Sequence, residues 1–185
     1  MKLAVPISKA NRLINSGNVI LVSAQYRDNA NIITIAWHCP VSSQPPVLAI
    51  AVGKSRFSAE LIKKSGEFIV NIPSWSLFDA MLYCGTHSGR DVAKFSETKL
   101  TPEKPVKLLR PPRIKECIGS IECALVDTKK IGDHIIFLGE VIYAEAEADL
   151  FKDGVWDTGK AELIYHLGGD RFMKSGPSEY RPDGD

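Results

Sequence analysis

The sequence predicts a mainly β protein, an antiparallel barrel of about seven strands with short helices packed at the barrel ends. Runs of β-branched and aromatic residues recur along the chain, and most of them are joined by short turns. The βαβ alternation that a doubly wound parallel sheet requires is absent. The seven expected strands cover residues 18–26, 31–38, 47–52, 67–72, 116–128, 134–146 and 163–167.

The chain opens with a short helix and a hairpin. Residues 8–15 form the expected helix, with Ser8 as its N-cap and Gly17 near its end. Residues 27–30 then connect the first two strands. The next segment, 40–46, contains three prolines. Because each proline removes a backbone donor and fixes φ, we expect this segment to be irregular.

Two further helices are expected in the first half. Residues 57–64 place apolar side chains on one face, with Ser55 available as N-cap and Gly66 at the end. Residues 74–84 carry a large apolar stripe, and the expected helix ends at Gly85. A polar segment and a long loop follow, up to a pair of prolines at 111–112.

The second half of the chain consists mainly of hairpins. A tight turn over 129–133 joins the two longest strands, and an Asp-Gly pair at 153–154 marks another hairpin. The tail 176–185 is polar and contains prolines. Since no internal repeat or linker interrupts the sequence, we expect one domain over residues 1–185.

Composition and charge exclude several classes of protein. A net charge of +1 gives no basic surface of the kind that binds nucleic acid. No apolar run approaches the roughly 20 residues that span a bilayer, and the amino terminus lacks a signal-peptide core. We therefore expect a cytoplasmic protein without membrane contact. The cysteines, Cys39, Cys84, Cys117 and Cys123, are irregularly spaced, which indicates that most are buried thiols rather than zinc ligands, with Cys39 left open because of its position.

The strand 31–38 ends in an unusual set of side chains. Trp37 and His38 close it, and Cys39 follows at once. An aromatic ring, an imidazole and a thiol at a strand end are more typical of a pocket border than of a plain core. We interpret this strand and the following loop as the seat of a cofactor ring, although tryptophan is also common in cores.

Two clusters of hydroxyl and cationic side chains are candidates for a phosphate site. Ser55 and Arg56 stand where a strand gives way to a helix, and Ser88, Arg90 and Lys94 lie within seven residues of one another. Each cluster alone also fits a simpler interpretation, a capped helix with a solvated arginine or an exposed loop. Together, in a nearly neutral chain, they indicate one shared phosphate ligand.

A histidine marks the start of a long strand. His134 follows a turn, where an imidazole at the barrel rim could exchange a proton near neutral pH, although a surface histidine fits as well. The other histidines show no metal-ligand spacing, and we expect structural roles for them: His38, His87 and His166. No Rossmann, Walker, nucleophile-elbow or EF-hand pattern occurs, and no metal site is expected.

Six motifs, taken in order, resemble the flavin reductase-like family. They are NIITIAW at 31–37, SQPP at 43–46, GKSRF at 53–57, EFIVNIP at 67–73, SGRDVAKF at 88–95 and GDHIIFLGEV at 132–141. The resemblance covers a core from about residue 5 to residue 173. It implies an FMN-binding split barrel that forms a homodimer.

The resemblance also implies roles for individual residues. The flavin ring would be lined, largely through backbone groups, by Thr34, Ile35, Ala36 and Trp37. The phosphate or ribityl chain would be held by Ser55, Arg56, Ser88, Arg90 and Lys94. The catalytic candidates are His134, near the flavin and the nicotinamide, and Cys39, which matches a thiol found in some members.

The activity implied is that of an FMN-dependent oxidoreductase. Electrons would pass from NAD(P)H through non-covalently bound FMN to free flavin, a ferric chelate or another acceptor. Two alternatives remain open: a flavoredoxin-like electron carrier that a redox protein partner reduces, and a non-catalytic flavin-binding or scaffold barrel. Hydride transfer depends on proximity and orientation, which explains why no catalytic triad is needed.

Overall fold

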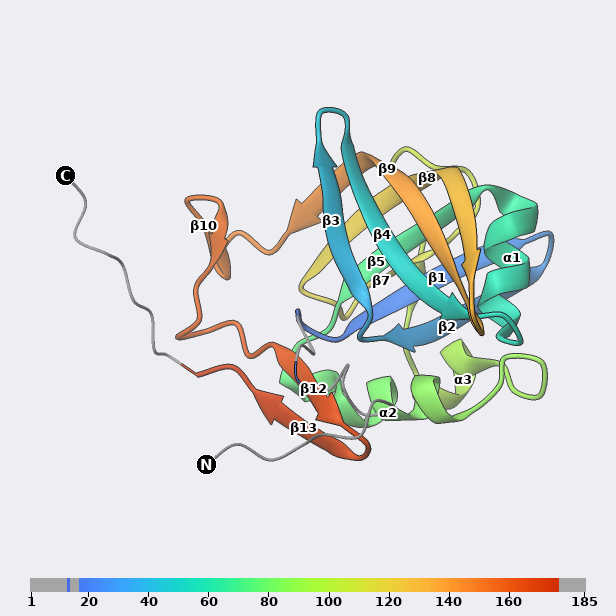
Figure 1. The fold of residues 1–185 in the computed structure, drawn as a ribbon. Coiled ribbons are helices and arrows are strands. Elements are labelled where there is room, and N and C mark those ends of the chain that lie inside the picture. Colours follow the sequence, from blue (N-terminus) through green and yellow to red (C-terminus); the bar gives the residue numbers. More distant parts are fainter. Residues whose placement is uncertain (1–12, 14–16, 177–185) are drawn as a thin grey trace, which may run out of the picture.

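A barrel-shaped sheet forms the centre of the molecule. The structure is a computed structural model that describes residue 13 and residues 17–176. The main sheet has seven strands: β1 (Ile20–Tyr26), β2 (Asn29–Ile35), β3 (His38–Ser43), β4 (Pro46–Gly53), β5 (Glu67–Ile72), β8 (Gly119–Ile131) and β9 (His134–Ala146). They lie in the order β2-β1-β5-β8-β9-β4-β3 and curl into a barrel (Figure 1). The predicted mainly β, antiparallel barrel is confirmed.

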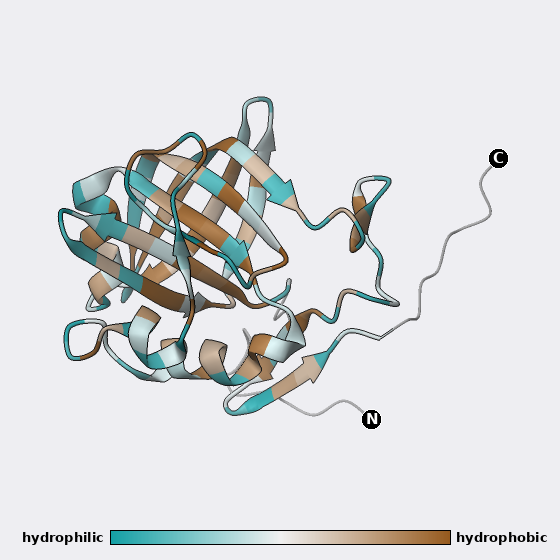
Figure 2. Cartoon of the chain, turned by 180° about the vertical axis from the view of Figure 1, so that it is seen from behind, coloured by the Kyte–Doolittle hydropathy of each residue, from teal (hydrophilic) through white to brown (hydrophobic). Residues whose placement is uncertain are grey.

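Apolar side chains fill the barrel interior. Phe68 on β5 and Ile135 and Phe137 on β9 are buried there. Apolar and polar residues alternate along the barrel strands (Figure 2), because successive side chains of a strand point to opposite faces. Gly139 lets the sheet close around the core, since a Cβ at that position would lie 2.5 Å from the Phe68 ring.

The first hairpin is confirmed, but its second arm is shorter than expected. β1 and β2 pair antiparallel, with Ile20 opposite Ile35. The expected strand 31–38 is interrupted after Ile35, and β3 begins only at His38. In the break, the Trp37 carbonyl accepts a hydrogen bond from the Ala51 N–H at 2.9 Å. One apolar run therefore supplies two strands and the connection between them.

The prediction of an irregular segment at 40–46 is wrong. β3 runs through Pro40 and pairs with β4, where Pro40 lies opposite Leu48. β3 is the last strand of the sheet, and a proline in an edge strand can turn its missing N–H side toward solvent. The sequence alone does not show which strand is at the edge.

The helices are short and pack against the barrel. α1 (Phe57–Ser65) buries Leu61 and Ile62 and ends at Gly66, which has a φ of 71°. Its N-cap is Arg56 without a side-chain cap, so the expected Ser55 cap is wrong. The expected helix 74–84 is a 3₁₀ turn, η2 (Trp75–Leu77), followed by α2 (Phe78–Thr86).

Several shorter elements complete the chain: α3 (Lys94–Thr98), β6 (Pro102–Glu103), β7 (Arg113–Ile114), β10 (Phe151–Lys152), β11 (Val155–Trp156), β12 (Ile164–Gly168) and β13 (Arg171–Lys174). The hairpin expected at 153–154 is confirmed as β10–β11. The expected last strand is β12; its partner β13 and α3 were not expected. The expected helix 8–15, apart from Leu13, and the tail beyond Gly176 lie outside the described residues.

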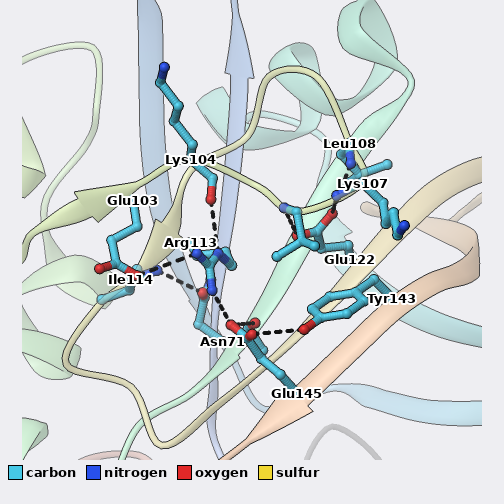
Figure 3. A network of polar contacts seen from close by, with 12 residues as sticks. Asn71, Glu103, Lys104, Lys107, Leu108, Arg113, Ile114, Glu122, Tyr143 and Glu145 are labelled. Atoms are coloured by element: carbon cyan, nitrogen blue, oxygen red, sulfur yellow. Dashed lines mark hydrogen bonds and ion pairs between the residues drawn. The ribbon is translucent and has the colours of Figure 1, made fainter.

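Buried polar groups fix a long loop to the outer face of the sheet (Figure 3). Glu122 on β8 has no exposed surface. Its carboxylate accepts backbone N–H groups of the loop at 2.5, 2.8 and 2.8 Å, from Val106, Lys107 and Leu108. Arg113, farther along, forms an ion pair with Glu145 on β9. The loop is thus held by carboxylates of two barrel strands.

Candidate functional site

A cleft of about 600 Å³ lies where the ends of β2 and β4 meet α2 and the β12–β13 hairpin. Its walls come from five parts of the chain: Ile33, Thr34, Ile35, Ala36 and Trp37; Ala51, Val52, Gly53, Ser55 and Arg56; Met81, Leu82, Gly85 and Thr86; Asp133 and His134; and His166, Gly168, Gly169 and Phe172. We call this space the large cleft. It brings together seven of the eleven residues that the sequence indicated as functional, and Cys39, Ser88, Arg90 and Lys94 do not line it.

Backbone groups at the end of β2 are open to this cleft. β2 is the first strand of the sheet, so only β1 pairs with it. Half of the backbone groups of such an edge strand point away from its partner. The Thr34 hydroxyl is engaged elsewhere, since it donates to the Met81 carbonyl at 2.6 Å. A ligand at this wall would therefore meet mainly backbone donors and acceptors.

Two rings stand together at one side of the large cleft. The centroids of Trp37 and His134 are 4.9 Å apart with 36° between the ring planes. His134 Nδ1 lies 2.7 Å from Asp133 Oδ1. This hydrogen bond lowers the pKa of Asp133, so Asp133 is a carboxylate at neutral pH. Since a carboxylate only accepts, Nδ1 carries the proton of a neutral His134, and Nε2 is left as the acceptor.

A pocket of about 80 Å³ shares several of its lining residues with the large cleft, Ser55 and Arg56 among them. We call it the small pocket. Lys94 lies in its wall with 4% of its surface exposed. The ammonium donates to the carbonyls of Ile32 and Cys84 at 2.7 and 2.6 Å. Burial lowers the pKa of Lys94. Since an ammonium has three N–H groups, one remains for a ligand.

Asn31 and Ser58 also line the small pocket, and sequence reasoning missed both as site residues. Asn31 is 3% exposed, and its Nδ2 donates to Ser58 Oγ at 2.9 Å. Its Oδ1 has no hydrogen-bond partner among the described residues. Gly89 closes over this amide, because a Cβ at position 89 would lie 2.0 Å from Oδ1. Glycine is thus required there for close approach.

Two of the predicted phosphate ligands have partners within the protein. The Arg90 guanidinium donates to the Ser55 carbonyl and to Glu60, at 3.2 and 3.0 Å, and lies over the Phe57 ring. Arg90 lines neither the large cleft nor the small pocket. Ser88 does line the small pocket, and its hydroxyl accepts the Arg90 N–H at 3.2 Å. Arg90 therefore fixes the loop to α1, which positions Ser88.

The structure places Cys39 apart from His134. Its exposed thiol lines a different cavity, of about 480 Å³, at one end of the barrel. We call it the barrel-end cavity. His166 and Phe172, by contrast, line the large cleft, although the sequence indicated a structural histidine and no strand at 172. Their rings lie 4.9 Å apart. This part of the cleft wall forms only because β12 pairs with β13, and the sequence did not predict that pairing.

No group of three His, Cys, Asp or Glu side chains in the described part of the chain gathers as metal ligands do. Within that same part, no helix is long and apolar enough to cross a membrane.

Known proteins are similar to this chain in sequence over most of its length. The family model for the flavin reductase like domain matches residues 12–170. An uncharacterised Archaeoglobus fulgidus protein is 33% identical over 155 residues, which is 84% of this chain and 86% of that protein. An uncharacterised Escherichia coli protein is 31% identical over 179 residues, with 94% and 95% covered.

Solved structures share the fold. A flavoredoxin from Methanosarcina acetivorans superposes with a TM-score of 0.84 at 28% identity, over 98% of this chain and 94% of that one. An FMN-binding domain of a flavin reductases-like enzyme from Shewanella baltica gives 0.81 at 26% identity, over 98% and 97%. These neighbours confirm the predicted split barrel. The chain belongs to the flavin reductase-like family.

Proposed function

We propose that this protein binds FMN and uses it to pass electrons from NAD(P)H to a small acceptor such as free flavin or a ferric chelate. The proposal rests mainly on one observation: the large cleft and the small pocket join, because they share wall residues such as Ser55 and Arg56. An open strand edge and aromatic rings lie on one side of this junction, and a buried lysine lies on the other. The similarity to flavoredoxins and to an FMN-binding flavin reductase-like domain supports it.

The residues present fit the two chemically different parts of FMN. A flat, mainly apolar ring with polar edges suits a wall of backbone groups at Thr34 to Trp37. A phosphate suits the hydroxyl and cationic groups of Ser55, Arg56 and Lys94. A volume of about 600 Å³ is in the range of cofactor clefts.

Bound FMN would supply the redox chemistry by accepting a hydride and passing on its electrons. The protein's own residues would hold the FMN, orient it and shield it from solvent. Trp37 is 45% exposed and lies beside His134, so the two rings can shape the place where a nicotinamide approaches. The Asp133 hydrogen bond fixes the orientation of the His134 ring and leaves Nε2 to accept a hydrogen bond from a donor in the cleft.

The homodimer and the cytoplasmic location expected from the sequence belong to this proposal. One alternative is favoured by a specific observation, the similarity to flavoredoxins from Methanosarcina acetivorans and Desulfovibrio vulgaris. In that case a redox protein partner, rather than NAD(P)H, would deliver the electrons. Both versions require FMN in the large cleft.

The proposed function is tested by one spectroscopic experiment. Protein reconstituted with FMN should show a flavin absorbance spectrum, and anaerobic mixing with NADH or NADPH should bleach it within the time of turnover. Bound flavin that neither nucleotide bleaches would favour the electron carrier. A protein that takes up no FMN would refute both versions.

The phosphate end is tested separately. Arg56→Ala removes a cation that lines both the large cleft and the small pocket, so FMN should bind about ten times more weakly. Arg27→Ala, on an exposed turn, is the matched control. Equal FMN affinity of the two variants by fluorescence titration would remove Arg56 from the phosphate site.

A further inference from the structure

The sheet beside the large cleft continues into the β8–β9 hairpin. β9 pairs with β4 on one side and with β8 on the other, so Gly53, His134 and Ile131 form one row across the three strands. Gly53 and His134 line the large cleft. Because residues directly opposite each other in a sheet point to the same face, Ile131 extends the face that carries the His134 ring. This face leads from the cleft onto the hairpin.

A lysine lies on the same face of the hairpin. Lys129 is two residues before Ile131 on β8, which makes it a diagonal neighbour of His134, and such neighbours are roughly 7–8 Å apart. Lys130 points to the opposite face, since its partner Ile135 is buried in the barrel core. Leading away from the cleft, the face therefore carries an imidazole, an isoleucine that is 53% exposed, and an ammonium.

A second lysine lies at the same rim of the cleft. Lys54 follows β4, and its N–H donates to the Asp133 carbonyl at 2.9 Å. The pKa of Asp133 is lowered first by the His134 hydrogen bond and more weakly by the charge of Lys54, which lies near that carboxylate. Lys54 and Lys129 are both exposed, and neither forms an ion pair with a described residue.

The carboxylates near these lysines have other donors. Asp133 lies 2.7 Å from the His134 ring nitrogen, and Asp127, which shares the face of Lys129, accepts the Thr128 N–H at 2.7 Å. The two ammonium groups are therefore available to an anion from outside the chain. A phosphate monoester carries roughly two negative charges at pH 7 and forms strong charge-assisted hydrogen bonds with such groups.

We propose that Lys54 and Lys129 bind the 2′-phosphate of NADPH and thereby make NADPH, rather than NADH, the preferred hydride donor. The two nucleotides differ only in this phosphate. The nicotinamide would lie at the Trp37–His134 ring pair and the adenosine over the exposed Ile131, with its 2′-phosphate at the lysines. NADPH would give its hydride to the bound flavin and leave as NADP⁺. The inference rests on the proposed function, in the version in which a nicotinamide nucleotide reduces the flavin.

Stopped-flow measurement of flavin bleaching tests the preference. FMN-saturated protein is mixed anaerobically with NADPH or NADH, and the second-order rate constants are compared. NADPH should react at least about tenfold faster, and added salt should reduce the difference because it screens exposed charges. Lys129→Gln should lower the NADPH rate constant roughly fivefold, and its combination with Lys54→Gln at least about tenfold, while the NADH rate constant stays unchanged.

Lys130→Gln is the matched control. It removes the same charge one residue away, on the opposite face of the hairpin, so its preference for NADPH should equal that of the native protein. The flavin spectrum and thermal melting show that each variant is folded and loaded with FMN. Equal effects of Lys129→Gln and Lys130→Gln would overturn the proposal, because only the general charge of the hairpin would then matter.

Binding is also measured without hydride transfer. Adenosine 2′,5′-bisphosphate and adenosine 5′-monophosphate are titrated calorimetrically into FMN-saturated protein. The bisphosphate should bind more tightly, and Lys129→Gln should remove most of the difference. If neither NADPH nor NADH bleaches the flavin, the proposed activity fails, and this titration still decides whether the lysines bind a 2′-phosphate. Equal affinity for the two adenosine phosphates, or bleaching by NADH as fast as by NADPH, would overturn the proposal.

Discussion

Substitution of Glu122 by glutamine should destabilise the protein strongly, although it replaces one oxygen by a nitrogen of similar size. In the native structure one carboxylate oxygen accepts the Lys107 and Leu108 N–H groups, and the other accepts the Val106 N–H. In Glu122→Gln, the amide NH₂ must face at least one of these N–H donors. One charge-assisted hydrogen bond is lost, worth roughly 1.5–3 kcal/mol, and a buried donor is left unpaired at a cost of roughly 1–3 kcal/mol. The free energy of unfolding should therefore fall by about 2–4 kcal/mol, because the loop can partly relax toward water.

Thermal and urea unfolding measure this change. For a chain of this length, about 2–4 kcal/mol corresponds to a drop in Tm of roughly 4–16 °C. The matched control is Glu116→Gln, because the Glu116 carboxylate accepts the Thr101 N–H at the surface rather than in the interior. Its free energy of unfolding should fall by less than about 1 kcal/mol. If the two variants lost equal stability, the buried hydrogen bonds of Glu122 would not be what holds the loop. FMN affinity should be unchanged in both, since neither residue lines the large cleft.

Three further predictions concern the site and pH. Gly89→Ala places a Cβ 2.0 Å from the Asn31 amide, so FMN should bind at least tenfold more weakly by titration, whereas Gly176→Ala, with nothing within 4 Å, should bind normally. His134→Ala should slow flavin reduction by NAD(P)H in stopped-flow more than it weakens FMN binding, and equal reduction rates would exclude His134 from that step. Burial acts to raise the pKa of Glu145, but hydrogen bonds, first among them those of Arg113 and Tyr143, outweigh it and leave that pKa below its usual 4.5. Stability from this group is present above pH 4.5 and is lost as pH falls through the lower folded-state pKa; Glu145→Gln should flatten this part of an acid-unfolding curve.

The barrel itself could be predicted because its signals are local. The longest hairpin, β8–β9, is encoded by two runs of β-branched residues and a glycine between them, and Gly132 there has a φ of 52°. The three prolines at 40–46 led to a wrong prediction for a non-local reason. Their cost depends on whether the strand is at an edge, and strand order is a property of the whole sheet.

The site could be predicted only in part, because burial and pairing depend on distant segments. Lys94 resembles an exposed loop cation in sequence, yet α3 turns its ammonium onto carbonyls 62 and 10 residues away. Arg90 has a similar local sequence and is held at the surface by Glu60. Nothing in the local pattern separates these two cations. The difference arises from where β2, α1 and α2 place their acceptors.

The break between β2 and β3 shows how one short run can serve two cavities. Trp37 lines the large cleft, while His38 and Cys39 line the barrel-end cavity. A continuous strand would alternate these side chains between two faces and would place Trp37 and Cys39 on the same one. The chain leaves strand geometry at Ala36 and Trp37, so the side chains before and after the break do not follow a single alternation. The reactive residues that lie together in the sequence are thereby separated in space, and a role for Cys39 beside the flavin would require a ligand that reaches both cavities.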